Sequence, residues 1–398
     1  MKTTVAGLAL LLLAGGSLLA EYTFFTPEGS YAVEVSLDAS PYQPRLPIYR
    51  NAISSLVVVG DYAIGGTSAN PGLSPFLFAV SLSRKKLEVV FDLTQVITGQ
   101  RSIQSGFGRG AGGVLYAGTM PDRAGEGGHL LQIRLRERSF EVVDLGIPVP
   151  GEGILAIAPG RSGETLYGIS HPSGRFFARH LRSQQSQIFD QTVPAPRTLG
   201  FLRQYALKAE DYLCRRLVLD QTGRIYGSYP VNKVFRFDPT SNVLDTLEDE
   251  LPEVWGRRPL GRVDAWATGP DGMLYGGNAG DGQLFKLNPH TGRVTNLGKP
   301  AMMPRVPGLA FGADGKLYGV TGGAPGYTHL FSYDPSAEGF RDLGNPRFTM
   351  TEPGIEQGIA WRGFQIATLA ASEDGRWMVL GEHEALSQLM VFPVQTKK

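Results

Sequence analysis

Short runs of alternating apolar and polar residues, each bounded by turn residues, recur along the chain. The stretches 220–228, 269–277 and 312–320 each place a glycine-containing turn before the sequence Leu/Ile-Tyr-Gly. Alternation of this kind puts successive side chains on opposite faces of a β-strand. The pattern therefore predicts short strands that are joined by tight turns, with no long helix between them.

A second motif follows each of these strands. Asp-Pro or Asn-Pro occurs within the stretches 234–240, 284–292 and 330–336, directly after two alternating apolar residues. Proline fixes φ in a turn, and the Asp or Asn side chain caps the turn. A further strand then ends in Asn296-Leu-Gly or Asp342-Leu-Gly. Each unit is therefore predicted to be a four-stranded antiparallel sheet.

Seven such units can be aligned along the chain. Units of about 40–50 residues that each contain four strands are typical of propeller blades. The sequence therefore predicts an all-β fold, a seven-bladed β-propeller of four-stranded antiparallel blades. The innermost strands of the blades are expected to begin at Ile53, Ser102, Ile154, Leu217, Val263, Pro307 and Ile366.

The last unit shows only three strands before the chain ends, at 366–371, 377–380 and 389–394. The segment from Tyr22 to Leu37 precedes the first blade and is rich in residues that favour strands. We expect it to supply the outer strand of the last blade, because this would close the ring and cover an open sheet edge.

One position in the second strand of the repeat is occupied by tyrosine in five of the seven units. Aromatic residues that recur once per blade are a normal packing feature of propellers. We therefore interpret this position as a packing slot between blades. Its occupants are Ile64, Tyr116, Tyr167, Tyr226, Tyr275, Tyr318 and Leu380.

The first twenty residues are typical of an export signal. Lys2 is followed by a short apolar run from Val5 to Ala14, and small residues at Ala14-Gly15-Gly16 offer a cleavage site, with Ala20 as a second option. Residues 1–20 are therefore predicted to be a signal peptide, and residues 21–398 a single propeller that is secreted or periplasmic. An uncleaved N-terminal anchor is the alternative.

Composition narrows the classes of function. The net charge of +1 gives no general attraction to nucleic acid or to anionic membranes. Cys214 is the only cysteine, so an intramolecular disulfide is excluded, and we expect this side chain to be a small buried one. No His, Asp or Glu cluster has the spacing of a metal site, so neither a metal nor another cofactor is expected. We expect a monomer.

The Asp-Gly…Leu-Tyr-Gly…Asp-Pro repeat, together with the export signal, resembles the broad group of exported bacterial propellers. That group includes streptogramin-lyase-like proteins and propeller polysaccharide lyases and glycosidases. The resemblance covers nearly the whole mature chain, but it rests on structural motifs. The Gly-His…Trp-Asp pairs of WD40 blades are missing from the sequence, as is the Asp box of sialidases, and four tryptophans are too few for a quinoprotein ring.

Departures from the repeat mark the candidate catalytic residues. In a propeller, the loops after the second strand of each blade lie at one mouth of the central channel, where ligands usually bind. Tyr229 and His383 depart from the small polar residues at their position, and His171 lies one residue beyond it. These three are the catalytic candidates, and ordinary exposed loop side chains are the alternative. The aligned position reads Thr67, Thr119, Ser170, Tyr229, Asn278, Thr321 and His383.

Arginine recurs just before the inner strands, at Arg216, Arg262 and Arg305, with Arg101 and Arg362 one residue further out. The longest connection, Val193 to Cys214, adds Arg203. A neutral protein that gathers guanidinium groups in one concave place is suited to an anionic ligand. The predicted ligand-binding residues are Arg203, Arg216, Arg262 and Arg305. The alternative is that these arginines pair with acidic neighbours such as Glu152, Glu352 and Glu356.

The resemblance implies a possible reaction at this site. Propeller lyases use a neutral base, often His or Tyr, to remove the proton α to a uronate carboxylate, while Arg neutralises that carboxylate. His171 or Tyr229 would then be the acid or base. The expected partner is an anionic carbohydrate or a similar anionic ligand. A non-catalytic propeller that binds a glycan or a protein is the alternative.

Overall fold

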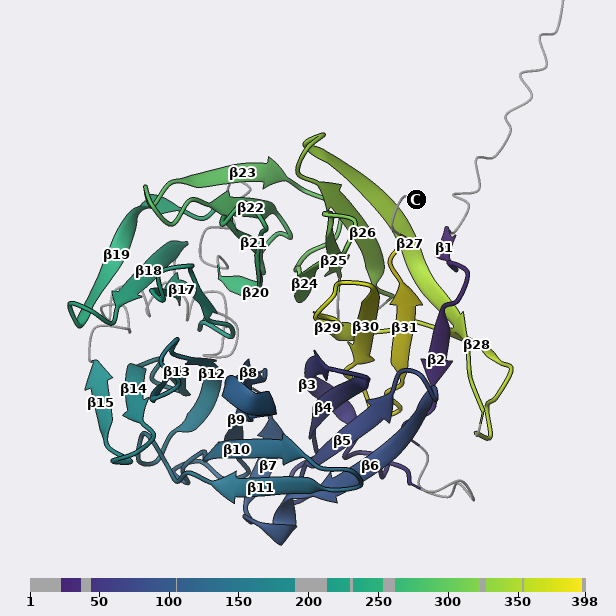
Figure 1. The fold of residues 1–398 in the computed structure, drawn as a ribbon, viewed down its shortest axis with the longest axis horizontal. Coiled ribbons are helices and arrows are strands. Elements are labelled where there is room, and N and C mark those ends of the chain that lie inside the picture. Colours follow the sequence, from purple (N-terminus) through teal and green to yellow (C-terminus); the bar gives the residue numbers. More distant parts are fainter. Residues whose placement is uncertain are drawn as a thin grey trace, which may run out of the picture.

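The computed structural model describes residues 23–36, 44–104, 106–189, 213–229, 232–252, 262–322, 327–352 and 354–395. In these ranges the strands form a ring of radially arranged sheets (Figure 1). The helical elements of the described ranges are two short 3-10 turns, η1 (Leu93–Gln95) and η2 (Ala111–Gly113). Within the same ranges, no helix is long and apolar enough to cross a membrane.

Blades 3, 4 and 5 are separate four-stranded sheets. Each has its strands in sequence order from the channel outward. Blade 3 contains β12 (Gly153–Pro159), β13 (Thr165–His171), β14 (Phe176–His180) and β15 (Ser186–Phe189). Blade 4 contains β16 (Val218–Leu219), β17 (Ile225–Tyr229), β18 (Lys233–Asp238) and β19 (Val243–Glu250). Blade 5 contains β20 (Val263–Thr268), β21 (Leu274–Asn278), β22 (Leu284–Leu287) and β23 (Val294–Gly298).

Blades 1 and 2 share one nine-stranded sheet, because β7 (Gln100–Ile103) pairs with a strand of each blade. Blade 1 contains β3 (Ala52–Val59), β4 (Tyr62–Ser68), β5 (Phe76–Ser81) and β6 (Lys86–Asp92). Blade 2 contains β8 (Gly108–Arg109), β9 (Leu115–Pro121), β10 (Leu130–Leu135) and β11 (Phe140–Asp144).

The remaining two blades involve the N-terminal segment. Blade 6 contains β24 (Gly308–Phe311), β25 (Leu317–Thr321), β26 (His329–Asp334) and β27 (Gly339–Thr349), and both β28 (Ala360–Arg362) and β1 (Phe24–Phe25) pair with β27. Blade 7 contains β29 (Ile366–Ala371), β30 (Trp377–Glu382), β31 (Leu389–Pro393) and β2 (Tyr31–Val33). The described sheets thus divide into seven four-stranded units.

The N-terminal segment closes the ring as predicted. Strand β2 pairs antiparallel with β31, with Tyr31 opposite Val391 and Val33 opposite Leu389. The sequence did not indicate that β1 also pairs with blade 6, in parallel with β27. The segment therefore joins blades 6 and 7, since β1 pairs with the one and β2 with the other (Figure 1).

The Tyr-Gly pair of the repeat has a packing explanation. A Cβ atom added at Gly276 would lie 2.3 Å from the ring of Phe285 on the next strand, so only glycine allows this approach. The same close approach joins Gly65 to Phe78, Gly168 to Phe177, Gly227 to Phe235 and Gly319 to Phe331. Each blade that carries the motif thus buries one phenylalanine against the backbone of its own second strand.

The tyrosine slot is structural, as predicted. The hydroxyl of Tyr275 donates to Asp271 Oδ2 at 2.9 Å, and that of Tyr318 donates to Asp314 Oδ2 at 3.1 Å. Burial raises the pKa of both phenols, and the neighbouring aspartates act in the same direction. In these two blades the slot therefore ties a turn to the strand that follows it.

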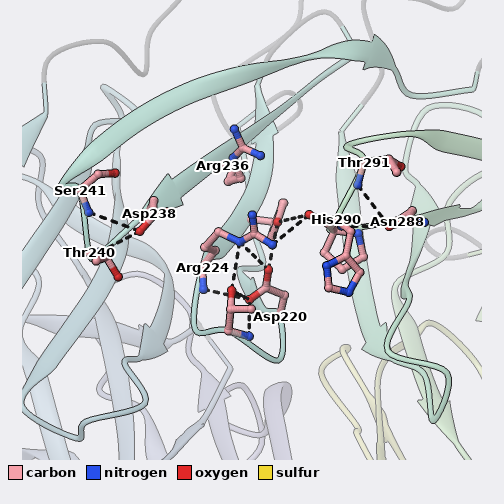
Figure 2. Close-up of polar contacts among 12 residues, drawn as sticks. Asp220, Arg224, Arg236, Asp238, Thr240, Ser241, Asn288, His290 and Thr291 are labelled. Atoms are coloured by element: carbon pink, nitrogen blue, oxygen red, sulfur yellow. Dashed lines mark hydrogen bonds and ion pairs between the residues drawn. The ribbon is translucent and has the colours of Figure 1, made fainter.

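The face opposite the candidate site holds a link between blades 4 and 5 (Figure 2). The guanidinium of Arg224 donates to Asp220 Oδ2 at 2.8 Å and to the carbonyl oxygen of Pro289 at 3.0 Å. His290 follows that proline in a turn that is capped by Asn288. This face thus contributes to packing between blades 4 and 5.

Candidate functional site

In four blades, a repeated β-bulge turns one residue of the inner strand toward the central channel. In blades 1, 3, 5 and 7 the pairing of the first two strands shifts by one residue at the same place. Bulges re-aim the side chain of the extra residue. The residues at these four bulges, all of which line one cavity, are Ser54, Leu155, Asp264 and Ala367.

Blades 4 and 6 continue this ring. Asp264 lies three residues before the strand residue that pairs with Tyr275. The same count before the partners of Tyr226 and Tyr318 gives Arg215 and Pro307. Both of these residues also line the cavity. Blade 2 contributes Arg101, Gln104 and Met120, so every blade reaches the cavity.

The cavity has a volume of about 350 Å³. It lies at the end of the channel where the second strands finish, because His171 and His383 are in its wall. Its described lining contains four arginines and one carboxylate, that of Asp264. The arginines of this lining are Arg101, Arg215, Arg216 and Arg305.

Asp264 is bonded to two arginines through their Nε atoms. Arg262 Nε donates to Oδ1 at 2.7 Å, and Arg305 Nε donates to Oδ2 at 3.0 Å. The side chains of Asp264 and Arg262 are 2% and 5% exposed, whereas that of Arg305 is 32% exposed. Burial alone would raise the pKa of Asp264, but Arg262, Arg305 and Arg215 hold it well below its usual range. Asp264 is therefore ionised at all ordinary pH values.

Positive charge is crowded around this carboxylate. Burial and the nearby Arg262, Arg305 and Arg216 lower the pKa of Arg215 to about 10, against the attraction of Asp264. One buried carboxylate thus faces several guanidinium groups. Such a cluster is suited to accepting a further negative charge.

The backbone at Arg305 is unusual. Its φ of 65° lies in the left-handed region, which residues other than glycine rarely adopt. Packing supports this segment, because a Cβ atom at Gly282 would lie only 2.4 Å from the carbonyl oxygen of Met303. Backbone strain of this kind is often found at functional sites, where the surrounding structure maintains it.

Arg216 spans the channel and forms the floor of the cavity. Its Nη1 atom donates to the carbonyl oxygen of Gln104, across the ring in blade 2, at 3.4 Å. Beyond it the channel wall is largely apolar and includes Leu56, Ile157 and Leu309. The carbonyl of Arg216 also accepts a hydrogen bond from the buried thiol of Cys214, and burial raises the pKa of that thiol.

The structure corrects the alignment of blade 7 by one residue. Ile366 pairs with Glu382, as Val263 pairs with Asn278 in blade 5. Glu382, not His383, therefore occupies the seventh equivalent position, and the packing slot holds Val379 instead of Leu380. The alignment from the sequence was wrong here because blade 7 lacks the tyrosine that marks the register in other blades. His383 is consequently equivalent to His171.

His171 and His383 face the same cavity from blades 3 and 7. The side chain of His383 is open to solvent within the channel mouth. The surrounding protein and the charges of Arg215 and Arg305 lower its pKa, against an opposing backbone hydrogen bond. His383 is therefore neutral at pH 7 and is able to accept a proton.

The other predicted residues have different placements. Tyr229 ends β17, but its side chain is outside the described residues, as are Arg203 and most of the loop that carries it. Arg362 ends β28, and its guanidinium lies 3.8 Å from the ring centroid of Tyr327 and 5.0 Å from that of Phe24. It therefore packs on aromatic rings, not in the cavity lining.

Two residues of the site were not predicted. Arg215 and Asp264 are central to it, and the carboxylate that pairs with Arg262 and Arg305 is Asp264, not one of the glutamates considered from the sequence. For Asp264, the available signal was a charged residue at the second position of the inner strand β20. Among the described residues, no group of three or more His, Cys, Asp or Glu side chains could hold a metal ion.

Comparison with known proteins confirms the fold. No known protein family matches the chain, and neither does any curated protein sequence. An extracellular domain assigned to the hybrid two component system BT4673 of B. thetaiotaomicron matches with a TM-score of 0.55 and 13% identity, over 93% of this chain and 40% of that one. The chain thus spans about two fifths of that structure.

Two smaller propellers match along nearly their whole length. Virginiamycin B lyase from Staphylococcus aureus has a TM-score of 0.56 and 10% identity, over 87% of this chain and 96% of that one. The WD40 repeats of RRP9 have a TM-score of 0.57 and 12% identity, over 87% and 95% of the two chains. At such identities the similarity establishes a β-propeller fold and nothing more specific.

Proposed function

We propose that this chain binds a carboxylate-bearing carbohydrate at the mouth of its central channel. The observation that supports this most strongly is the charge of the cavity lining, where four arginines face the single carboxylate of Asp264. That carboxylate already accepts hydrogen bonds from Arg262 and Arg305 on its two oxygens. A ligand carboxylate would supply the second negative charge that the cluster needs.

The form of the donors favours a planar anion. Guanidinium groups pair with carboxylates through two parallel hydrogen bonds, and a uronic acid residue carries such a group on a polar ring. The cavity also contains polar groups from Ser54, Gln104 and the two histidines, which suit sugar hydroxyls. Export of the chain, as its first twenty residues predict, would bring it into contact with acidic polysaccharides.

Binding should depend strongly on Arg305, which is the more exposed partner of Asp264. We expect Arg305→Ala to weaken binding of pentagalacturonate by about 10- to 100-fold, because a charge-assisted hydrogen bond contributes about 1.5–3 kcal/mol. Isothermal titration calorimetry measures this, and the affinity of the wild type should fall as salt is added.

The control variant is Arg138→Ala, which removes an exposed arginine outside the cavity. It should bind as the wild type does, and the neutral maltopentaose should not bind to either protein. Equal affinity of Arg305→Ala and the wild type would contradict an anion site at this place.

A second candidate function is β-elimination at the same site. It is supported by the neutral state of His383. This side chain lines the same cavity as the arginines that would hold a uronate carboxylate. His383 would remove the proton α to the carboxylate, and the arginines would stabilise the resulting enolate. His171 or Tyr229 would then protonate the leaving oxygen. One propeller of the same fold is, by its name, a lyase.

If the wild type cleaves a uronic acid polymer, His383→Ala should lower turnover by about 10²–10⁴-fold, because a positioned base is lost. The ultraviolet absorbance of the unsaturated product measures turnover. Tyr275→Phe is the control, since it loses only a hydrogen bond in a packing slot and should keep full turnover. If the wild type binds pentagalacturonate but cleaves no uronic acid polymer, β-elimination is contradicted and the binding function stands alone.

Binding should also depend on pH through His383, whose pKa lies below the ordinary value of 6.5. Protonation adds a positive charge beside Arg215 and Arg305, so affinity for pentagalacturonate should rise as the pH falls through that pKa. Calorimetry at about pH 7.5 and about pH 5 tests this, with His383→Asn as the comparison. The same pH dependence in His383→Asn would contradict the prediction.

A further inference from the structure

Glu382 is a buried carboxylate next to the site, and no step above uses it. Its side chain is fully buried, and its two oxygens accept hydrogen bonds from three N–H groups. Oε1 accepts from the backbone of Phe364 at 2.9 Å, while Oε2 accepts from Trp361 Nε1 at 3.0 Å and from the backbone of Gln388 at 2.9 Å. A carboxyl group suits this place because its two oxygens can accept hydrogen bonds from several N–H donors.

These contacts enclose the loop that begins with His383. The loop runs from the end of β30 to Gln388, and Glu382 bonds to both the segment before β29 and the end of the loop. His383 itself donates its backbone N–H to the carbonyl oxygen of Gln365, at 3.0 Å. Gln365 follows Phe364, so the bonds to Glu382 and the bond from His383 hold the same two segments together.

The loop is also tied to the N-terminal segment. The side chain of Gln388 accepts a hydrogen bond from the backbone of Val35 at 2.8 Å, and the hydroxyl of Ser36 donates to the carbonyl oxygen of Ser387 at 2.6 Å. The equivalent positions in other blades hold Thr67, Ser170 and Asn278, which are smaller and uncharged. A glutamate at this position is therefore specific to the blade that carries His383.

We propose that Glu382 is a positioning residue, which fixes the imidazole of His383 in the channel mouth by joining the three segments around its loop. This rests on the proposed function, since it assigns His383 to the ligand site. Glu382 does not touch the ligand. Burial raises the pKa of its carboxyl group to about 8, although the hydrogen bonds from Phe364, Gln388 and Trp361 act in the opposite direction. The bonds from these donors are the ones the loop depends on.

The test is the pKa of His383 in the unliganded full-length protein, measured by NMR with His383→Asn to assign its signal. The charged groups that act on this imidazole are Arg215 and Arg305, which lower its pKa, with Glu384 beside it in the loop. Glu382→Gln places an amide N–H₂ against N–H donors, so the loop should loosen and the imidazole of His383 should move away from Arg215 and Arg305. Its pKa should then rise toward 6.5, and pentagalacturonate should bind about 10-fold more weakly.

The shift separates two roles for Glu382. A role through charge alone would leave the pKa of His383 unchanged in Glu382→Gln, because a carboxyl group with a pKa of about 8 is largely protonated in the range where His383 titrates. Trp361→Phe is the milder variant for the case in which Glu382→Gln does not fold; it removes one donor and should raise the pKa by a smaller amount. The matched control is Thr67→Val, at the equivalent buried position of blade 1, which should leave the pKa of His383 unchanged.

An unchanged or lowered pKa of His383 in folded Glu382→Gln or Trp361→Phe would overturn the proposal, and so would an equal rise in Thr67→Val. The measurement needs no ligand. A wild type that fails to bind pentagalacturonate would therefore count against the proposed function alone, while the pKa of His383 would still decide the role of Glu382.

Discussion

A truncated chain that begins after Ser36 is expected to lose at least about 5 kcal/mol of its free energy of unfolding, which is of the order of the whole stability of a domain. The reason is that β2 is the outer strand of blade 7 and is fully buried along its length. Tyr31, Val33 and Val35 all belong to the hydrophobic cluster between blades 7 and 1. Without them the ring would open at its last blade.

Urea titration monitored by tryptophan fluorescence measures this loss. The control is a chain that begins at Pro27, which lacks β1 but keeps β2. Phe25 is only partly buried, although it packs on Phe392 at a ring distance of 5.1 Å, so the control should lose much less. Equal free energies of unfolding for the two truncated chains would show that β2 does not stabilise the ring.

Asp264→Asn should have the second large effect. The substitution keeps the shape of the side chain but removes the one negative charge that Arg262, Arg305 and Arg215 face in the buried cluster. Breaking a buried ion pair by removing one partner typically costs about 3–5 kcal/mol, because the other charge is left uncompensated. We expect a loss of this size in the free energy of unfolding, together with a change in binding of anions.

The pH dependence of this loss follows from the lowered pKa of Asp264. A carboxylate whose pKa is lower in the folded than in the unfolded protein stabilises the fold above the unfolded value of 3.8. That stabilisation is lost as the pH falls through the folded value. The difference between wild type and Asp264→Asn should therefore be constant from about pH 5 to about pH 8 and should shrink only in strong acid. A difference that disappears near pH 7 would contradict the charge assignment.

Features shared by all blades were predictable from the sequence. The Leu-Tyr-Gly and Asp-Pro motifs identified the strands because turn chemistry and close packing of glycine act locally, and the incomplete last blade identified the N-terminal strand as its complement. The register of blade 7 was not predictable from the tyrosine slot, because Val379 replaces the tyrosine there. The resulting alignment error of one residue placed His383 at the position that Glu382 occupies in the structure.

The site itself was predicted only in part. His171 and His383 were identified as departures from the repeat, and Arg216 and Arg305 as recurring arginines, and all four line one cavity. Asp264 was missed because a β-bulge aims it at the channel, and a bulge depends on how paired strands fit in the ring, not on local sequence. Arg215 was missed because it lies before the first strand of blade 4, where the repeat gives no register. Arg262 was predicted to meet the ligand, but it lies buried beside Asp264 and acts on it instead.

A crystal structure of the protein grown with pentagalacturonate is the most direct test of an anion site at the channel mouth. The predicted result is a uronate carboxylate within hydrogen-bond distance of Arg305 and Arg215, above the floor formed by Arg216 and beside His383. An oligosaccharide bound elsewhere on the ring, while the cavity between His171 and His383 holds only water, would contradict it.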